Sequence, residues 1–210
     1  MYMQVRTCFD GLNVVHNLSR FQKNPGTQHW QALIHLLGYL KVAAHYKLIY
    51  QPPPEGISAE EWVKLTGFVN TDYAGCKDMR RSTSGYMFTM LGTPVSWSSK
   101  HQGTVALSTT EAEYIFLARA AQQARWMYLW CNEIRFTQQE PAVLKGDNTG
   151  SIHLSKNTKD HHKVKHIDIL HHFLCELVSE EKITILQIPE NNNPADIFTK
   201  PLASVHSALT

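Results

Sequence analysis

Three carboxylates and one amide occur where the sequence predicts strands to end or helices to begin. They are Asn70 in GFVNTDYAG, Glu113 in STTEAEY, Asp147 in LKGDNTG and Asp196 in NNNPADIFTK. Divalent cations prefer oxygen ligands that approach from several directions, so carboxylates from separate elements are what a site for two such ions requires. The amide of Asn70 carries no charge, and the chemistry of the whole set depends on it.

The elements that would position these residues follow from hydrophobic periodicity. Apolar runs predict strands over 64–72, 84–91, 95–99, 142–146 and 183–188, with a hairpin loop at Gly92-Thr93-Pro94. Ser108 or Thr109 can cap a long helix after the third strand. Further helices are expected from Asp147-Asn148, over about 165–180 and around Asp196.

The resulting order, βββαβααβα, predicts an α/β fold with a mixed five-stranded sheet and helices on its faces. Three antiparallel strands come first, and helical crossovers then lead to two parallel strands. Right-handed crossovers place the fourth strand beside the first. Asn70 and Asp147 then lie at the carboxyl ends of neighbouring strands, at the switch in strand order where α/β sheets bind ligands.

A small helical segment is predicted before this sheet, in residues 1–50. One short helix ends at Asn24-Pro25-Gly26, and the next has apolar residues at Trp30, Leu33, Leu36, Leu37 and Leu40. Three prolines then indicate a linker over 51–60, followed by a domain over 61–202 and a tail over 203–210. The apolar side of the second helix can pack on that domain or on a polymerase.

Composition limits the class of protein. No apolar run approaches the roughly 18–20 residues that span a bilayer, and the opening MYMQVRTCFDG has no apolar signal region, so neither a membrane partner nor secretion is expected. Four cysteines without a CxxC pair favour a reducing, intracellular compartment, cytoplasm or nucleus. The net charge of +2 does not by itself indicate a nucleic-acid binder. No sequence feature indicates the oligomeric state.

Nine sequence blocks occur in an order that identifies a family. They are LSRF (18–21), HWQALIHLLGYLK (29–41), RSTSGY (81–86), VSW (95–97), ALSTTEAEY (106–114), GDN (146–148), KHIDI (165–169), HF (172–173) and ADIFTKPL (195–202). In this order they resemble the ribonuclease H region that ends the Pol polyprotein of copia-type LTR retrotransposons. The resemblance covers nearly the whole chain, and residues before about 50 resemble the connection segment that follows a reverse transcriptase.

The resemblance implies a ribonuclease H-like fold and cleavage of the RNA strand of an RNA/DNA hybrid during reverse transcription. It also implies two Mg²⁺ or Mn²⁺ ions, one to activate the attacking water and one to stabilise the leaving 3′ oxygen. Carried over by position, Glu113, Asp147 and Asp196 match three metal-binding acids of the family. Asn70 occupies the position of the fourth, where the family has Asp.

Asn70 therefore predicts a weakened enzyme. An amide brings no charge and one oxygen rather than two, so one ion should bind weakly and the attacking water should be less acidic. Asp72, where the family commonly has an acid, lies about 6.5–7 Å further along the same face of the strand. It can supply some of the missing charge through a water molecule, or it can simply cap the Tyr73-Ala74-Gly75 turn.

The other acids also have structural alternatives. Glu111 and Glu113 point roughly 200° apart on a helix, so only one can face the site, and family position selects Glu113. Asp147 can be the N-cap of the following helix. Asp196 can be a carboxylate that favours a helix start.

Basic and small polar side chains are the candidates for binding a hybrid, because such duplexes are recognised mainly through their backbones and groove shape. The candidates are Lys100 and His101 after the third strand, and Lys163, Lys165 and His166 in a basic segment. A solvated helix face would carry the same charges.

Two classes of function follow from the sequence. One is a metal-dependent ribonuclease H weakened by Asn70, and the other is a degenerate ribonuclease H-like domain that binds nucleic acid or a protein without cutting; a relic of an inserted element is a third reading. The chain contains no Asp-Asp pair, so it lacks the acidic hairpin of a polymerase site. A reverse transcriptase domain is therefore a possible partner rather than a part of it.

Overall fold

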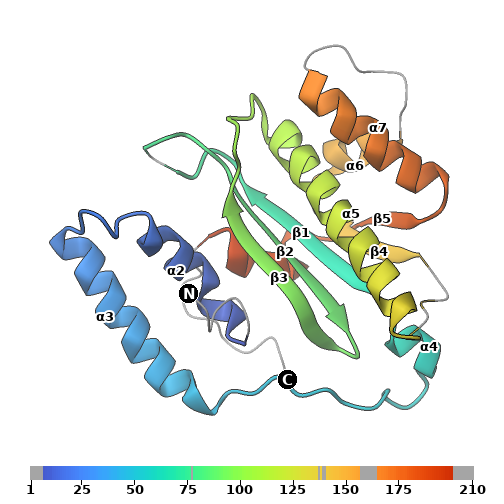
Figure 1. Cartoon of the computed structure of the whole chain (residues 1–210), viewed down its shortest axis with the longest axis horizontal. Coiled ribbons are helices and arrows are strands. Elements are labelled where there is room, and N and C mark those ends of the chain that lie inside the picture. The colour runs from blue at the N-terminus through green and yellow to red at the C-terminus, as the bar shows by residue number, and fades with distance from the viewer. Residues whose placement is uncertain (1–6, 77, 137, 139–140, 157–164, 201–210) are drawn as a thin grey trace.

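The computed structural model of the protein describes residues 7–76, 78–136, 138, 141–156 and 165–200 (Figure 1). Before the sheet come η1 (Phe9–Gly11), α2 (Leu12–Ser19), α3 (Thr27–Val42), η2 (Ala43–His45) and α4 (Ala59–Trp62). The sheet region contains β1 (Thr66–Asp72), β2 (Thr83–Met90), β3 (Thr93–His101), α5 (Thr109–Glu133), β4 (Ala142–Gly146), α6 (Thr149–Lys156), α7 (Lys165–Ser179), β5 (Ile183–Gln187), η3 (Glu190–Asn192) and η4 (Pro194–Phe198).

The sheet has the strand order β3-β2-β1-β4-β5. Strands β1, β2 and β3 pair antiparallel, while β4 lies parallel to β1 and β5 parallel to β4. The predicted mixed five-stranded sheet is confirmed, and so is the position of the fourth strand beside the first. The carboxyl ends of β1 and β4 therefore adjoin at the switch in strand order.

Apolar residues fill both faces of the sheet because neighbouring residues on a strand point in opposite directions. Phe88 belongs to the larger core, which β1, β2, β4 and β5 form with α5, α6 and α7. Met87, one residue earlier, belongs to a smaller core on the other face with Leu12, Ala195 and Phe198. The second core attaches α2 and η4 to the sheet.

The predicted hairpin loop between β2 and β3 was wrong by two residues. Thr93 and Pro94 are part of β3, paired with Met90 and Thr89, and the turn is Leu91-Gly92. Both turn residues have positive φ, 55° and 67°, and a two-residue turn of this kind matches the right-handed twist of the strands. Pro94 is tolerated because β3 is an edge strand.

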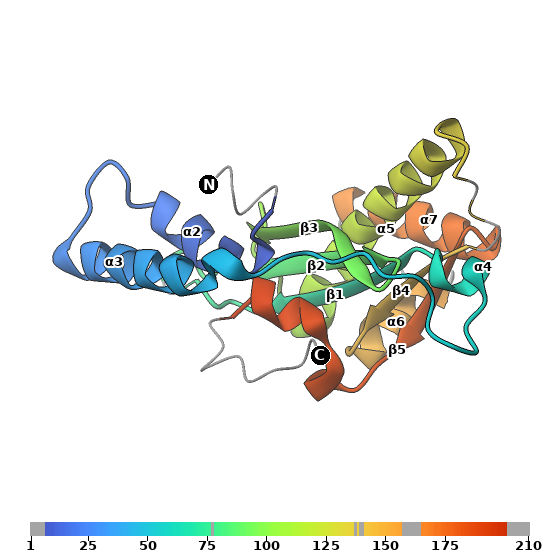
Figure 2. The same cartoon turned by 90° about the horizontal axis from the view of Figure 1, so that it is seen from below.

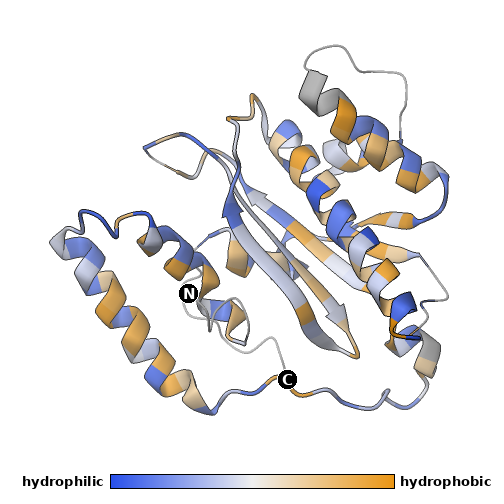
Figure 3. Ribbon diagram, in the orientation of Figure 1, coloured by the Kyte–Doolittle hydropathy of each residue, from blue (hydrophilic) through white to orange (hydrophobic). Residues whose placement is uncertain are grey.

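Helix α3 extends away from the sheet and lies at the opposite end of the molecule from α6 and α7 (Figures 1 and 2). Its apolar residues are visible along much of its length in Figure 3. Leu36 is buried, but the side chains of Trp30 and Leu37 are 62% and 52% exposed. Leu33 and Leu40 are partly buried. The expected apolar side of this helix is therefore covered in part and exposed at Trp30 and Leu37.

Residues 46–58 contain no helix or strand and lead from η2 to α4. They are held to the sheet region at two points, since the carbonyl of Ile49 accepts a hydrogen bond from Thr93 and that of Gln51 accepts one from Trp62. Among the described residues, no helix is long and apolar enough to cross a membrane. All four cysteines are unpaired.

Helix η4 rests directly on the middle of the sheet. A Cβ atom placed on Gly85 of β2 would lie 2.3 Å from the Cβ of Phe198, so only glycine allows this approach. The carbonyl of Phe198 accepts hydrogen bonds from Asn13 Nδ2 at 2.9 Å and Ser99 Oγ at 2.6 Å. These contacts come from α2 and β3 and fix the position of the segment that carries Asp196.

Replacing Gly85 should therefore destabilise the fold. We expect Gly85→Ala to lower the free energy of unfolding by about 1–3 kcal/mol, the usual cost of overpacking, because η4 must move off the sheet. Urea denaturation measures this change. The matched control is Gly38→Ala in α3, where a Cβ meets nothing within 4 Å and a gain of about 0.5–1 kcal/mol is expected. Equal midpoints for Gly85→Ala and wild type would contradict this packing.

Candidate active site

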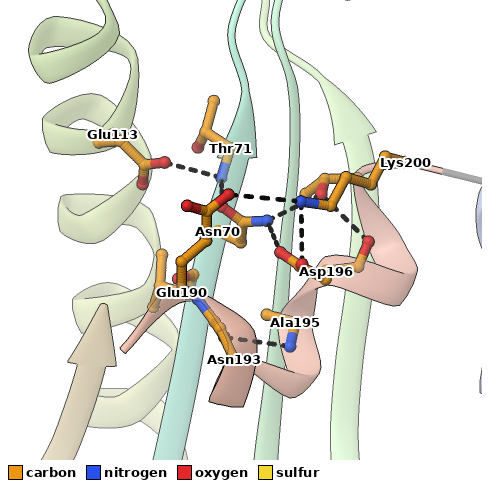
Figure 4. Close-up of polar contacts among 10 residues, drawn as sticks. Asn70, Thr71, Glu113, Glu190, Asn193, Ala195, Asp196 and Lys200 are labelled. Atoms are coloured by element: carbon orange, nitrogen blue, oxygen red, sulfur yellow. Dashed lines mark hydrogen bonds and ion pairs between the residues drawn. The ribbon is translucent and has the colours of Figure 1, made fainter. Parts of the chain in front are cut away.

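Four elements bring the predicted site residues to one end of the sheet. Asn70 lies in β1, Glu113 in the first turns of α5, Asp147 directly after β4, and Asp196 in η4. Figure 4 shows Glu113 and Asp196 approaching Asn70 from opposite sides. Asp147 lies close enough to Glu113 to raise the pKa of that carboxyl group, and Asp196 lies close enough to Asp147 to raise the pKa of Asp147.

Glu113 is buried, and its Oε1 accepts a hydrogen bond from the backbone N–H of Thr71 at 3.0 Å. Burial, followed by the nearby negative charge of Asp147, raises its pKa to about 8. Glu111 lies outside the site: its Oε2 accepts from the backbone of Leu107, and Ser108 caps the helix by accepting from the N–H of Glu111. Of the two glutamates, Glu113 is the one that faces Asn70.

Asp147 is not the cap of α6. That role belongs to Asn148, whose Oδ1 accepts from the N–H of Ser151 at 2.9 Å. The Asp147 carboxyl group is left to face the site, and its pKa is raised by burial and by the negative charges of Asp196 and Glu190.

Asp196 is likewise not a cap, because Asn193 caps η4 by accepting from the N–H of Ala195. The Nδ2 of Asn193 also donates to the carbonyl of Val69 at 2.9 Å, which holds this turn against β1. Asp196 Oδ1 accepts a hydrogen bond from Asn70 Nδ2. The Asn70 amide donates to Thr199 as well, at 3.0 Å.

The orientation of the Asn70 amide explains why Asn and Asp differ here. Its Oδ1 accepts from the N–H of Thr71 at 2.7 Å, so its NH₂ group faces Asp196. An Asp in this position would turn a second negative oxygen toward Asp196, and two carboxylates this close repel each other without a cation between them. The amide replaces that repulsion with a hydrogen bond.

Lys200 and Glu190 also belong to the site, although sequence reasoning did not select them. The Nζ of Lys200 lies 2.9 Å from Asp196 Oδ2 and 3.9 Å from Glu190 Oε1 (Figure 4). The pair with Asp196 raises the pKa of Lys200, so its ammonium remains charged. Its position four residues after Asp196 was the available signal, since residues with this spacing share one side of a helix.

Asp72 lies further along β1, where a Cβ on Gly75 would come within 1.8 Å of its Oδ2. Its carboxyl group is thus folded over the turn that follows the strand. Lys200 is nonetheless close enough to offset part of the rise that burial causes in the pKa of Asp72. From this position Asp72 can contribute charge to the site or cap the turn.

The predicted substrate contacts differ in their surroundings. Lys100 is exposed near the end of β3. His101 is engaged within the protein, because its Nδ1 lies 3.0 Å from Thr83 Oγ1 and its Nε2 lies 3.3 Å from Arg20 Nη1. Lys163 lies outside the described residues, as do the side chains of Lys165 and His166 at the start of α7.

The donor set as arranged does not fit two divalent ions. Such ions require several oxygens aimed at a common point, whereas an NH₂ group and an ammonium group occupy the two oxygens of Asp196. Within the described part of the chain, no three or more His, Cys, Asp or Glu side chains are grouped closely enough to hold a metal ion. The expected pair of ions stays a prediction from the family resemblance.

The pKa of Glu113 predicts how stability depends on pH. The folded protein keeps this proton up to about pH 8, while the unfolded chain releases it near 4.5, so the free energy of unfolding should fall as pH rises between these values. The slope attributable to this group is at most about 1.4 kcal/mol per pH unit. Urea denaturation between pH 6 and 8, in EDTA, should show this decline in wild type and a flatter profile in Glu113→Gln. Identical slopes would contradict it.

Comparison with known proteins identifies the chain's relatives. It is 38% identical over 200 residues to the retrovirus-related Pol polyprotein from transposon TNT 1-94 of Nicotiana tabacum, covering 95% of this chain but 14% of the polyprotein. It is 32% identical over 189 residues to the polyprotein from transposon RE1 of Arabidopsis thaliana, covering 90% and 12%. The chain therefore spans a small part of these relatives.

A shorter relative is matched over most of its own length. This is the secreted RxLR effector protein 161 of Plasmopara viticola, 43% identical over 127 residues, which cover 60% of this chain and 84% of that protein. No protein-family model matches the chain.

Solved structures are similar to the chain at low sequence identity. The foamy viral protease–reverse transcriptase in complex with double-stranded DNA matches with a TM-score of 0.50 and 14% identity, over 80% of this chain and 30% of that one. The N-terminal ribonuclease H domain of a Mycobacterium tuberculosis protein matches with a TM-score of 0.48 and 18% identity, over 65% and 91%. With its strand order and its polyprotein relatives, the chain is a ribonuclease H-like domain homologous to the Pol polyproteins of copia-type retrotransposons over most of its length.

Proposed function

We propose that this domain cleaves the RNA strand of RNA/DNA hybrids slowly, as part of retrotransposon reverse transcription. The observation that carries the proposal is the convergence of Glu113, Asp147 and Asp196 beside Asn70 at the switch point of the sheet. Ligands of α/β sheets bind at such points. The relationship to Pol polyproteins supports the same assignment.

The expected slowness follows from Asn70. The family resemblance implies that full activity requires two Mg²⁺ or Mn²⁺ ions. Asn70 and Lys200 occupy the oxygens of Asp196 that would bind such ions. Without the charge of an Asp at position 70, the site has less negative charge with which to attract cations.

A second candidate is a domain that binds the hybrid without cutting it. The observation in its favour is that both oxygens of Asp196 already have partners within the protein. The two candidates differ in one measurable property, which is residual cleavage by the wild-type chain.

The decisive variant is Asn70→Asp. We expect it to cleave a labelled RNA/DNA hybrid in Mn²⁺ at least about 10–100-fold faster than wild type, because altering even the outer partners of a metal site changes activity by that factor. Asn70→Asp combined with Asp196→Asn is the control for contaminating nuclease. Wild type with no cleavage, beside an active Asn70→Asp, would favour the binder; an inactive Asn70→Asp would refute cleavage as the function.

The same assay tests the role of Asp72. If its carboxylate supplies some of the missing charge, Asp72→Ala should abolish the residual cleavage of wild type. Asp78→Ala is a matched control, because Asp78 is exposed and pairs with Arg20 away from the site. If Asp72→Ala cleaves as fast as wild type, Asp72 does not supply charge to the site, and its role is limited to the turn at Gly75.

For the hybrid, we propose backbone contacts from Lys100, with Lys163, Lys165 and His166 as further candidates. Lys100 is exposed on β3, one residue before the end of the strand. The ring nitrogens of His101 already have partners in Thr83 and Arg20, so among the two residues of β3 Lys100 is the stronger candidate. Unpaired cysteines accord with an intracellular place of action, which we also propose.

A reverse transcriptase domain is the partner that we propose for the exposed side of α3. Residues 1–50 would then be its connection segment, 51–60 the linker, 61–202 the ribonuclease H-like domain and 203–210 a tail. The foamy viral structure, itself a reverse transcriptase, is matched over 80% of this chain, which supports this assignment. Exposed apolar side chains such as Trp30, Ile34 and Leu37 are suited to such a contact.

This partner can be tested by size-exclusion chromatography with a copia-type reverse transcriptase domain. We expect co-elution with wild type and its loss in the double variant Trp30→Ser, Leu37→Ser, because both side chains contribute apolar surface to α3. Leu129→Ser on α5 is the control, since it removes an exposed leucine elsewhere. Co-elution that survives the double variant would argue against α3 as the contact.

A further inference from the structure

Lys200 reaches Asp196 because of the way the chain leaves η4. The backbone N–H groups of Thr199 and Lys200 both donate to the carbonyl of Asp196, at 3.0 and 3.1 Å. This tight turn brings the Lys200 side chain back over the carboxylate four residues earlier, where Nζ lies 2.9 Å from Oδ2. The Asp196 side chain is 17% exposed and that of Lys200 is 40% exposed, so water screens the pair only in part.

The other oxygen of Asp196 is occupied from the opposite side. Asn70 Nδ2 donates to Oδ1, and the same amide donates to Thr199 in the turn that positions Lys200. The amide and the ammonium therefore hold one carboxylate between them, as Figure 4 shows.

The Lys200 charge also acts on the rest of the acidic cluster. Its Nζ lies 3.9 Å from Glu190 Oε1, and its interaction extends electrostatically to Asp147 and Asp72. Carboxylates gathered in this way need a compensating cation, which in metal-dependent sites is the ion itself. Here the chain carries a cation of its own at that place.

We propose that Lys200, together with the Asn70 amide, replaces a divalent ion as the counter-charge of this acidic cluster. The cluster is then stable without metal, and an ion can reach Asp196 only by displacing Lys200. This inference rests on the proposed function only for the identity of the competing ion. Lys200 acts by holding the Asp196 carboxylate in place, and it does not contact the substrate.

The test compares thermal melting of wild type and Lys200→Met in EDTA and in millimolar Mn²⁺, without nucleic acid. Wild type should melt at nearly the same temperature in both. Lys200→Met should melt lower in EDTA and recover about 2–4 °C in Mn²⁺, as expected for an ion present at several times its Kd. Mn²⁺ titration followed by electron paramagnetic resonance should show at least about tenfold tighter binding to Lys200→Met.

Two variants separate this effect from general damage. Lys182→Met removes a lysine whose side chain is 40% exposed, the same fraction as Lys200, and which pairs with Glu180 outside the site. It should show no response to Mn²⁺. Lys200→Arg keeps the charge and should behave as wild type even if Lys200→Met folds poorly.

Two results would overturn the proposal. One is a wild-type protein that gains as much stability from Mn²⁺ as Lys200→Met does, and the other is a Lys200→Met variant that melts like wild type in both buffers. Neither result depends on cleavage, so failure here is distinct from failure of the hybrid assay.

Discussion

The packing of η4 on the sheet is the constraint on which the candidate site depends. Phe198 lies against Gly85, and its carbonyl accepts hydrogen bonds from Asn13 and Ser99. Elements α2, β2 and β3 therefore all contact η4 and hold it in place. Once η4 is packed in this way, the position of Asp196 relative to Asn70 and Lys200 is fixed. The helical segment before the sheet thus takes part in building the site, although it contributes none of the acidic residues.

The balance of charge among the carboxyl groups determines whether the site needs a bound cation. Three carboxylates at one sheet end would repel one another, and Glu113 avoids part of that repulsion by keeping its proton up to about pH 8. Asp196 is balanced differently, by the Asn70 amide and the Lys200 ammonium. On this ribonuclease H-like framework, the counter-charge beside Asp196 thus comes from groups of the chain itself.

Sequence predicted the features that periodicity and connection rules control. The strand order, and the placement of Asn70 and Asp147 at the carboxyl ends of adjoining strands, followed from short antiparallel connections and right-handed crossovers. What depends on local hydrogen bonds was left open or was wrong: the cap of α6 is Asn148 and not the alternative Asp147, and Leu91-Gly92 closes the hairpin in place of the longer loop that was predicted. Lys200 was missed because its role appears only once the turn after η4 places it over Asp196.

An amide and an ammonium group hold Asp196 where a divalent ion would otherwise bind. Anomalous diffraction from wild-type crystals soaked in millimolar Mn²⁺ tests this most directly, because it locates bound manganese without reference to activity. We predict no manganese peak beside Asp196, and a Lys200 side chain still paired with its carboxylate. A peak shared by Asp196 and Asp147, with Lys200 displaced, would contradict the account.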